Sequence, residues 1–508
     1  MVQTHSRTPQ DYTQWVSRLL AHTGSYGVVS RLSQQLGVAR QTLYRWKAKG
    51  QAALEAAFNA VAQRADRQCP LERAILTLLV EGHASYRGIQ RCLWMLLGQQ
   101  VSLGTIASVI QRAGKLAQQW MSQHAPASVR ALALDELYGT EHGQAYLNVV
   151  DVHSGAVWAS TCPVAVDGES WTLVLWELEE QGIEWQTAVS DGGRAIAEAV
   201  ASVAPEGSHQ RDVWHVLHSC QQVQARLDRL VQRLEQQVPV VARQAARKAA
   251  GKGLRGKNPK SDVSAHAAQL AQARYVAASL GYLSGELHRL LEVVVLADPR
   301  AQGVMPSSAR YEELETLLIL LDELRQAATA DMQPHLKSLV TLLRAALPHL
   351  VLFAPGLDGL QECASQGLGS DGIQLLAWAW QRRSILGPTS QDLLQGLPPD
   401  WRPIAEPVLL AWDQAVRASS VVENWHSVLR PYLAVHRCLS SGMLALLAVW
   451  HNHRIAGRGL HQGQSPLMRS GLTDVASDWL VALGYPPPGP ALLPASAAYP
   501  EPSLALAA

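Results

Sequence analysis

Near the start of the chain, in residues 10–65, apolar residues recur at the spacing of a helix. In residues 27–50 a first apolar face is followed by a glycine at position 37 and then by a second apolar face. Gly37 suits a tight turn, so the segment predicts a helix-turn-helix. The two faces comprise Val28, Val29, Leu32 and Leu36 before the turn, and Val38, Leu43 and Trp46 after it.

The second of these helices leaves a polar, mostly basic flank. If it enters a major groove, two or three of its side chains can reach base edges while the others bind phosphate. An ordinary helical hairpin is the alternative interpretation. The residues expected to contact DNA are Arg40, Gln41, Tyr44, Arg45 and Lys47.

Residues 71–114 predict a second helix, turn and helix. Ser102 is expected to cap the last helix, and Gly114 is expected to end it. Arg87, Arg91, Arg112 and Lys115 supply positive charge. Two such modules in tandem would span a longer DNA site than one.

From residue 131 the pattern changes to short, strand-like apolar runs. Ser154 and Gly155 predict a hairpin between the second and third runs. The order β-β-β-α-β-α-β predicts a mixed α/β sheet. The predicted strands are 131–135, 145–153, 156–161, 187–191 and 209–213, and the predicted helices are 169–181 and 193–203.

Residues 215–418 show amphipathic helical periodicity almost throughout. Within them, residues 242–260 contain seven Lys and Arg and no acid, which is typical of a phosphate-gripping loop or of a solvated surface loop. The Pro/Ala-rich end predicts disorder. The predicted divisions are 1–66, 67–128, 129–217, 218–415, 416–484 and a tail at 485–508. The fold class is therefore multidomain α + α/β, combining N-terminal helix-turn-helix modules, a mixed sheet and a large all-α region.

Composition adds a charge asymmetry to this picture. The 508-residue chain has a net charge of +1, yet residues 1–130 hold 15 Lys and Arg against 5 Asp and Glu. A basic arm on an otherwise acidic protein indicates a polyanion partner or a solvated basic surface. The N-terminus lacks the apolar stretch of a secretory signal, no run is long enough to cross a membrane, and the six cysteines form no CxxC pair. These features favour a cytoplasmic protein.

Three acids are the candidate chemical site. Asp135 ends the first predicted strand and Asp191 the fourth, and these strands can lie side by side. Glu423 opens a helix at 418–433, so the three carboxylates could hold Mg²⁺ or Mn²⁺. The alternatives are a turn former or helix cap for each aspartate, and a capping box between Ser420 and Glu423.

The spacing in that late helix predicts which side faces the sheet. Val421, Trp425, Val428 and Tyr432 are expected to face it, and Glu423, His426, Ser427 and Arg430 to lie on the opposite arc. A helix across the sheet edge can still present Glu423 to the metals from its flank. Arg430 is expected either to contact phosphate or to be a surface residue. His451 and His453 are two residues apart on a helix and are expected to diverge.

Four segments together carry a family resemblance. LALDELY (132–138), VSDGGRAI (189–196), DVWH (212–215) and SSVVENWHSVLRPYL (419–433) resemble bacterial insertion-sequence transposases of the DDE type, and WHNHRIAGRGLHQGQSPL (450–467) is similar to the segment that closes their catalytic domain. The resemblance covers roughly residues 25–475.

The resemblance implies an RNase H-like catalytic domain interrupted by a helical insertion. It implies that Asp135, Asp191 and Glu423 are the catalytic triad and bind two Mg²⁺ or Mn²⁺ ions, with Glu136 as an alternative acid. Asp212 and His215 match a Cys/Asp-x-x-His element that is implied to support the active site. Structurally, His215 by itself is more typical of a packing residue.

The expected activity is metal-dependent DNA cleavage and strand transfer by a transposase. Its partners would be double-stranded DNA, as transposon ends and target, and further copies of the chain in a homodimer or larger oligomer, with no membrane. A location on the bacterial nucleoid in the cytoplasm would follow. Two other functions stay open: a domesticated DNA-binding protein without catalysis, and an RNase H-type nuclease acting on RNA–DNA hybrids.

Overall fold

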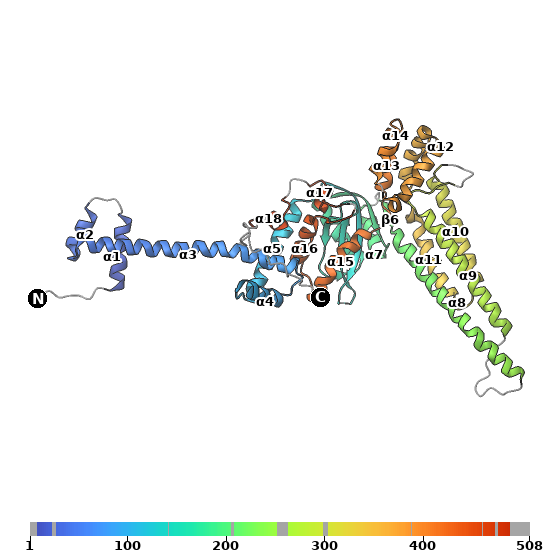
Figure 1. Cartoon of the computed structure of the whole chain (residues 1–508), viewed down its shortest axis with the longest axis horizontal. Coiled ribbons are helices and arrows are strands. Elements are labelled where there is room, and N and C mark those ends of the chain that lie inside the picture. Colours follow the sequence, from blue (N-terminus) through green and yellow to red (C-terminus); the bar gives the residue numbers. More distant parts are fainter. Residues whose placement is uncertain are drawn as a thin grey trace, which may run out of the picture. The chain divides into compact units, whose positions relative to one another are not determined.

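The computed structural model describes most of the chain, and its parts are shown in Figure 1. The described residues are 8–22, 27–140, 142–204, 208–250, 263–297, 303–387, 389–459, 461–472 and 476–487, without the side chains of 57–70, 208, 384 and 386. The described residues form two compact units, one within the ranges 1–110 and 480–508 and the other within 111–479. The chain is multidomain and combines helical parts with a mixed sheet, as predicted.

Three helices form a small core at the start of the first unit. They are α1 (Pro9–Ala21), α2 (Val28–Leu36) and the first turns of α3 (Arg40–Val80). Leu19, Leu32 and Leu43 are buried at their centre. Gly37 ends α2 with a φ of +62°, a conformation that favours glycine. A helix, a glycine turn and a second helix therefore occur where the sequence predicts them.

The helix α3 is 41 residues long and runs through the predicted boundary at 66/67. It is followed by α4 (Tyr86–Leu97) and α5 (Leu103–Gln123). The prediction that Ser102 caps α5 is confirmed, because its hydroxyl accepts a hydrogen bond from the Thr105 amide at 3.0 Å. The prediction that Gly114 ends α5 is wrong. Gly114 lies inside the helix, where a Cβ atom would approach the backbone of Gly442 to 2.8 Å, so this glycine serves close helix packing.

Six strands form one mixed sheet in the second unit. The order is β3-β2-β1-β5-β6, with β4 pairing to β2. The strand β1 is antiparallel to β2 and parallel to β5, so the first and fourth predicted strands do lie side by side. The strands are β1 (Ser128–Tyr138), β2 (Gln144–Asp151), β3 (Val157–Ser160), β4 (Val164–Ala165), β5 (Glu184–Ser190) and β6 (Ser208–Arg211).

The sheet differs from the prediction in two places. Asp135 was expected at the end of its strand, but β1 continues to Tyr138 because β2 pairs with it up to that residue. The two-residue strand β4 was not predicted. Asp191 does follow directly after β5, as expected.

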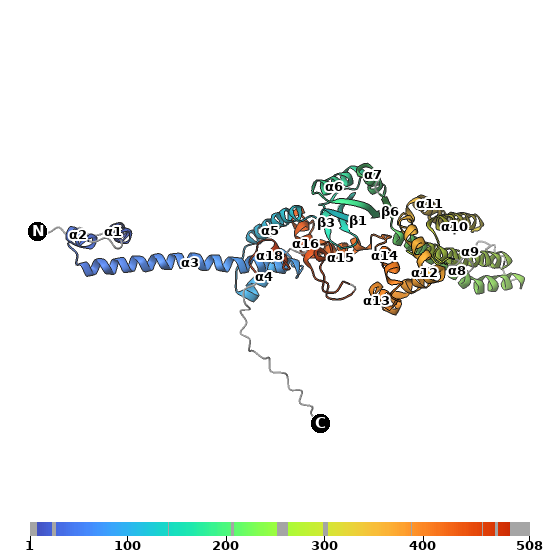
Figure 2. The same ribbon diagram turned by 90° about the horizontal axis from the view of Figure 1, so that it is seen from above.

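Helices cover both faces of the sheet (Figure 2). On one side lie α6 (Gly168–Glu180) and α7 (Arg194–Val203), and on the other lie α15 (Ser420–Val435) and α16 (Ser441–His453). The helix α16 is fastened to β3 by Asn452, whose side-chain amide accepts from the Val157 N–H at 2.8 Å and donates to its carbonyl at 2.9 Å. This pairing satisfies backbone groups at the edge of the sheet.

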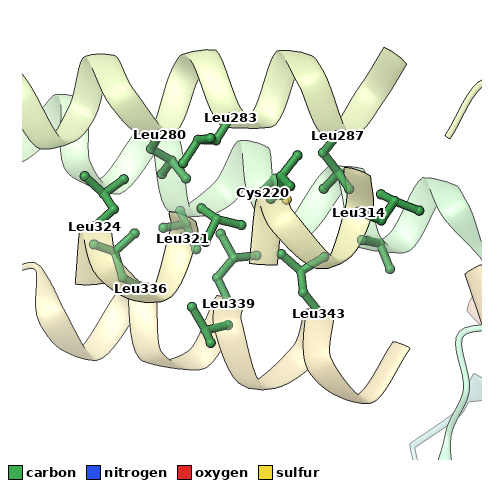
Figure 3. Close-up of a cluster of buried hydrophobic side chains, with 14 of the residues drawn as sticks. Cys220, Leu280, Leu283, Leu287, Leu314, Leu321, Leu324, Leu336, Leu339 and Leu343 are labelled. Carbon is green, nitrogen blue, oxygen red and sulfur yellow. The ribbon is translucent and has the colours of Figure 1, made fainter. Parts of the chain in front are cut away.

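The long helical region divides into two cores. The helices α8 (Val213–Ala249), α9 (Val263–Leu290), α10 (Ser307–Ala327) and α11 (Gln333–Leu350) form a four-helix bundle around a leucine-rich interior (Figure 3). The second core joins α12 (Pro355–Leu386), α13 (Ser390–Gly396) and α14 (Arg402–Asp413). Short helices α17 (Pro466–Arg469) and α18 (Trp479–Ala482) come last. The prediction of a large all-α region after the strands is confirmed.

The helical region leaves the sheet domain and returns to it at one point. The amide of Val213, where α8 begins, donates to the Arg417 carbonyl at 2.9 Å. The region is therefore an insertion whose two ends are joined, which brings the later helix α15 back onto the sheet.

Some sequence predictions concern residues at the margins of the described chain. Of the basic segment 242–260, residues up to Ala249 belong to α8 and residues 251–260 lie outside the described residues. Tyr485 is buried, so the tail was predicted to begin too early; residues 488–508 lie outside the described part. In the described chain no single helix is long and apolar enough to span a bilayer, although α11 together with residues 355–383 passes that test as a bent pair.

Candidate active site

A row of polar side chains crosses the sheet beneath α15. Asp135 of β1 is the direct cross-strand partner of Asn148 of β2, and Asn148 is the partner of Ser160 of β3. Because directly opposed residues project to the same face of a sheet, these three side chains share one surface. In β2, Asn148 interrupts an apolar run that is buried from Ala145 to Val150.

Asn148 is fully buried, and its amide orientation is fixed by its partners. Its Oδ1 accepts from the indole N–H of Trp425 at 2.9 Å and from the Ser160 hydroxyl at 2.7 Å. An indole nitrogen can only donate, so the oxygen must be on that side. The NH₂ group therefore points to the Tyr146 carbonyl at 2.9 Å and to Nε2 of His426 at 3.2 Å.

This orientation also fixes the tautomer of His426. Nε2 accepts a hydrogen bond from the Asn148 amide and is therefore unprotonated, so Nδ1 carries the imidazole hydrogen. Nδ1 lies 3.8 Å from Asp135 Oδ2 and 3.8 Å from Glu423 Oε2. Burial lowers the pKa of His426 to about 4. The charge of Glu423 opposes this decrease, and the charge of Arg430 adds to it. The ring is neutral at physiological pH and presents an N–H to both carboxylates.

The position of His426 corrects the sequence analysis. The residue was expected on the outer arc of its helix, but only 1% of its surface is exposed. The buried face of α15 consists of Val422, Trp425, His426, Leu429 and Tyr432, one position away from the predicted face. Trp425 and Tyr432 face the sheet as predicted.

Glu423 lies in the first turn of α15, with its carboxylate partly open to solvent. Its Oε2 is 3.0 Å from the guanidinium of Arg430, which is also partly exposed. No side-chain hydrogen bond caps the helix at Ser419, so the alternative of a capping box at Ser420 and Glu423 is wrong. The carboxylate therefore pairs with Arg430 and not with a backbone amide of its own helix. The oxygens of Asp135 and Glu423 and a nitrogen of His426 all lie within 4.8 Å of one another.

Asp191 approaches this group from the next strand. The β1–β5 register pairs Ala133 with Val189, so Asp191 follows the strand that neighbours Asp135. Its Oδ1 accepts from the Gly193 amide at 2.8 Å, as a turn former would. Asp191 is not part of the described group whose ligand atoms lie within 4.8 Å of one another, but it lies at the end of the neighbouring strand and its charge raises the pKa of Asp135.

The electrostatics of Asp135 reflect this crowding. Burial raises the pKa of Asp135 to about 7, with further increases from the charges of Asp191, Glu136 and Glu423 and a decrease from the Glu136 backbone N–H. Several carboxylates in a partly buried place repel one another unless a proton or a cation neutralises them. The arrangement is thus suited to a divalent cation with oxygen ligands.

Glu136 points to the opposite face of the sheet. Its Oε1 accepts from the indole N–H of Trp171 on α6 at 3.0 Å. Successive strand residues alternate faces, so Glu136 cannot replace Asp135 beneath α15. Burial raises the pKa of Glu136, against the effect of the Trp171 hydrogen bond.

Arg211 is a charged neighbour of Asp191 that the sequence analysis did not predict to belong to the site. It ends β6 beside Ser190, and a Cβ atom on Gly192 would overlap its guanidinium. Burial lowers the pKa of Arg211, while Asp191 and Asp212 raise it. Gly192, with a φ of +75°, leaves the space that this arginine occupies.

Asp212 holds the joint between the sheet and the inserted helices. Its Oδ1 caps α8 by accepting from the His215 amide at 3.2 Å, and its Oδ2 accepts from the Ser419 amide at 2.7 Å and from the Ser419 hydroxyl. Asp212 therefore anchors the start of α15, the helix that carries Glu423. The His215 ring packs edge-on against Trp214, with centroids 5.0 Å apart, rather than joining the acids.

The remaining predicted residues lie elsewhere. In the first unit Arg40, Gln41, Tyr44 and Arg45 are exposed and Lys47 is half-buried. His451 and His453 diverge as expected, since one contacts the Gly155 carbonyl and the other the Val449 carbonyl of its own helix.

Asn148 and His426 are the main residues that the sequence analysis missed. A single amide inside the apolar strand YLNVVD was a usable signal for the first. For His426, the usable signal was its place beside Trp425 in a helix with two overlapping apolar stripes.

No protein-family model matches the chain, and no curated protein matches it.

Proposed function

We propose that this chain is a DDE-type DNA transposase that cleaves the ends of a mobile element and joins them to target DNA. The observation that carries the proposal is the meeting of Asp135 and Glu423, from distant parts of the chain, at equal distances of 3.8 Å from Nδ1 of His426. A helical insertion separates the acids in sequence, and its joined ends return the glutamate to the sheet.

The sheet order supports an RNase H-like catalytic domain in this proposal. The acids belong to the central strand β1, to the end of its parallel neighbour β5, and to a helix packed on the same face. Burial of Asp135, and to a lesser extent the charges of the neighbouring acids, raise its pKa to about 7, which fits a site that holds divalent cations.

The residues proposed to hold two Mg²⁺ or Mn²⁺ ions are Asp135, Asp191 and Glu423. Such ions, when bound, supply Lewis-acid activation of the attacking oxygen and charge stabilisation for the leaving oxygen. His426 would be a positioning residue, because its free hydrogen faces the acids and its other nitrogen is taken by Asn148. Arg430, beside Glu423 at the surface, would contact a DNA phosphate.

The N-terminal helices would bind the terminal inverted repeats. Arg40, Gln41, Tyr44 and Arg45 form an exposed flank at the start of α3, and Lys47 is next to it. Exposed cations mixed with groups able to read base edges suit a major groove. Two transposon ends must be held together for joining, so a homodimer or larger oligomer on DNA is part of the proposal.

The proposal is tested by cleavage of a duplex that carries the inverted repeat flanking the coding region. Asp135→Asn, Asp191→Asn and Glu423→Gln should each abolish Mg²⁺-dependent cleavage and leave binding to the duplex unchanged. Glu136→Gln is the matched control, since it alters a neighbouring acid on the opposite face and should retain cleavage. Cleavage by any of the first three variants would remove that residue from the triad, and absence of cleavage by the wild-type chain would favour a DNA-binding protein without catalysis.

A further inference from the structure

The inserted four-helix bundle carries its charges on opposite sides. Its helices pack in the ring α8-α9-α10-α11, with α11 also contacting α8, so α8 and α10 lie diagonally opposite. The helix α8 has six Lys and Arg against two acids, whereas α10 has five acids against two arginines. The bundle is therefore polarised from a basic α8 to an acidic α10.

The cations of α8 share one exposed flank. At 100° per residue they fall within an arc of about 140°, and Asp228 and Glu235 fall outside it. Glu235 pairs with Arg274 of α9 at 2.6 Å, which shows that the acidic flank is the one turned to α9. All six cationic side chains are exposed: Arg226, Arg229, Arg233, Arg243, Arg247 and Lys248.

In the part of the chain that the structure describes, no carboxylate pairs with this basic flank. Among the described residues none of the six cations forms an ion pair, and the hydrogen bonds of Arg229 and Arg243 go to carbonyls of their own helix. The neighbouring helix α11 contains no Asp or Glu at all. Like charges at helical spacing repel one another, so the positive charge of this flank is uncompensated, and binding of a polyanion would neutralise it.

We infer that this basic flank of α8 is a second DNA-binding surface that contacts the phosphate backbone of duplex DNA. From Arg226 to Lys248 the stripe extends for about 33 Å, or about one turn of duplex at 3.4 Å per base pair. The cations would contact phosphates, which with the sugars take about half to two-thirds of protein–DNA hydrogen bonds and carry no sequence information. The surface is distinct from both the N-terminal helices and the acidic site.

This inference rests on the proposed function only for the identity of the polyanion. It does not require the acids to be catalytic. A chain that never cleaves DNA could still use the flank, and an active transposase could lack any use for it. The two proposals therefore fail separately.

The test is the salt dependence of binding between the full-length chain and a random-sequence DNA duplex longer than the stripe. Removing three phosphate contacts should lower the slope of log K against log salt by about 2.7, and the loss of affinity should be greatest at low salt. One variant replaces Arg243, Arg247 and Lys248 by Gln, and a second replaces Arg226, Arg229 and Arg233 by Gln. Glutamine keeps a high helix propensity, so both variants should fold.

The control replaces Arg274, Arg289 and Arg325 by Gln, removing the same net charge from α9 and α10. These arginines already pair with Glu235, Glu286, Glu313 and Asp322, so their charges are largely neutralised within the protein and should contribute little to DNA binding. The control should bind with the wild-type slope. A wild-type slope in either α8 variant, or an equal fall in the control, overturns the inference. Cleavage of the element's end by the same variants reports separately on the acidic site.

Discussion

The side-chain amide of Asn148 donates to Nε2 of His426 across 3.2 Å, and this one contact determines where the imidazole hydrogen points. Because Trp425 and Ser160 occupy the amide oxygen, the amide cannot turn round. The hydrogen on Nδ1 is thereby directed at Asp135 and Glu423. The sheet and the late helix together therefore fix the orientation of the His426 ring.

The first prediction concerns His426 as a positioning residue. Replacing it by Phe keeps a planar ring but removes the N–H that faces the two acids. Loss of such a supporting group lowers metal affinity or activity by about 10- to 100-fold. The readout is the Mg²⁺ concentration for half-maximal cleavage, which should rise in the variant.

Ser427→Ala is the control for this substitution, since the Ser427 hydroxyl only bonds the Asn424 carbonyl at 2.6 Å on the exposed side of α15. If His426→Phe cleaved with wild-type metal dependence, the ring would be a packing residue only.

The second prediction concerns pH. The pKa of Asp135 is raised to about 7 in the folded chain, so the folded state holds a proton that the unfolded state releases near its ordinary value. The stability associated with this proton is complete below about pH 4 and is lost as the pH rises through about 7, at about 1.4 kcal/mol per unit of pKa difference. Asp135→Asn keeps a neutral group at every pH.

In the presence of a chelator, the melting temperature of Asp135→Asn should therefore exceed that of the wild type at about pH 8, and the difference should shrink at about pH 5. Divalent cations should raise the melting temperature of the wild type more than that of the variant. A difference that is the same at both pH values would show that Asp135 is not buried among like charges.

The third prediction uses two helical glycines. Ala at Gly114 would bring a Cβ atom to 2.8 Å from the Gly442 backbone, so it should destabilise the chain, by about 1–3 kcal/mol. Ala at Gly285 of α9 meets nothing within 4 Å and should stabilise it, by up to about 1 kcal/mol. Chemical denaturation of both variants would measure the opposite signs. Equal effects would indicate that α5 and α16 do not pack closely at Gly114.

The fourth prediction concerns Asp212 as the anchor of α15. Its replacement by Ala leaves the buried Ser419 amide and hydroxyl without an acceptor and should cost at least about 3 kcal/mol in the free energy of unfolding. Asp392→Ala, which removes an exposed capping box from α13, is the comparison and should cost less. An Asp212 variant as stable as that comparison would contradict the anchoring role.

Local patterns in the sequence were sufficient for most of the sheet. Strand periodicity located five of the strands, and the acid after β5 was found because a charge directly follows a buried run. The end of β1 was misjudged because its last residues are ordered by pairing with β2, which is a tertiary effect. The position of Gly114 is typical of a helix end, but the glycine is needed because the backbone of Gly442, in a helix far along the chain, packs against it.

The buried face of α15 shows why part of the site escaped sequence analysis. Val421 and Val422, and likewise Val428 and Leu429, are adjacent apolar pairs, so two stripes one residue apart both satisfy helical periodicity. Only packing on β1 and β2 selects the stripe that buries His426. Asn148 likewise can be recognised as part of the site only through its contacts with His426 and Trp425, which are almost 280 residues later in the sequence.

The most direct measurement is calorimetric titration of the full-length chain with Mn²⁺, comparing the wild type with Asp135→Asn, Glu423→Gln and the control Glu136→Gln. Three carboxylates converging on one edge of the sheet should give saturable binding in the wild type and the control, and weak or absent binding when Asp135 or Glu423 is neutralised. Binding that is the same in all four proteins would contradict a metal site built from these acids.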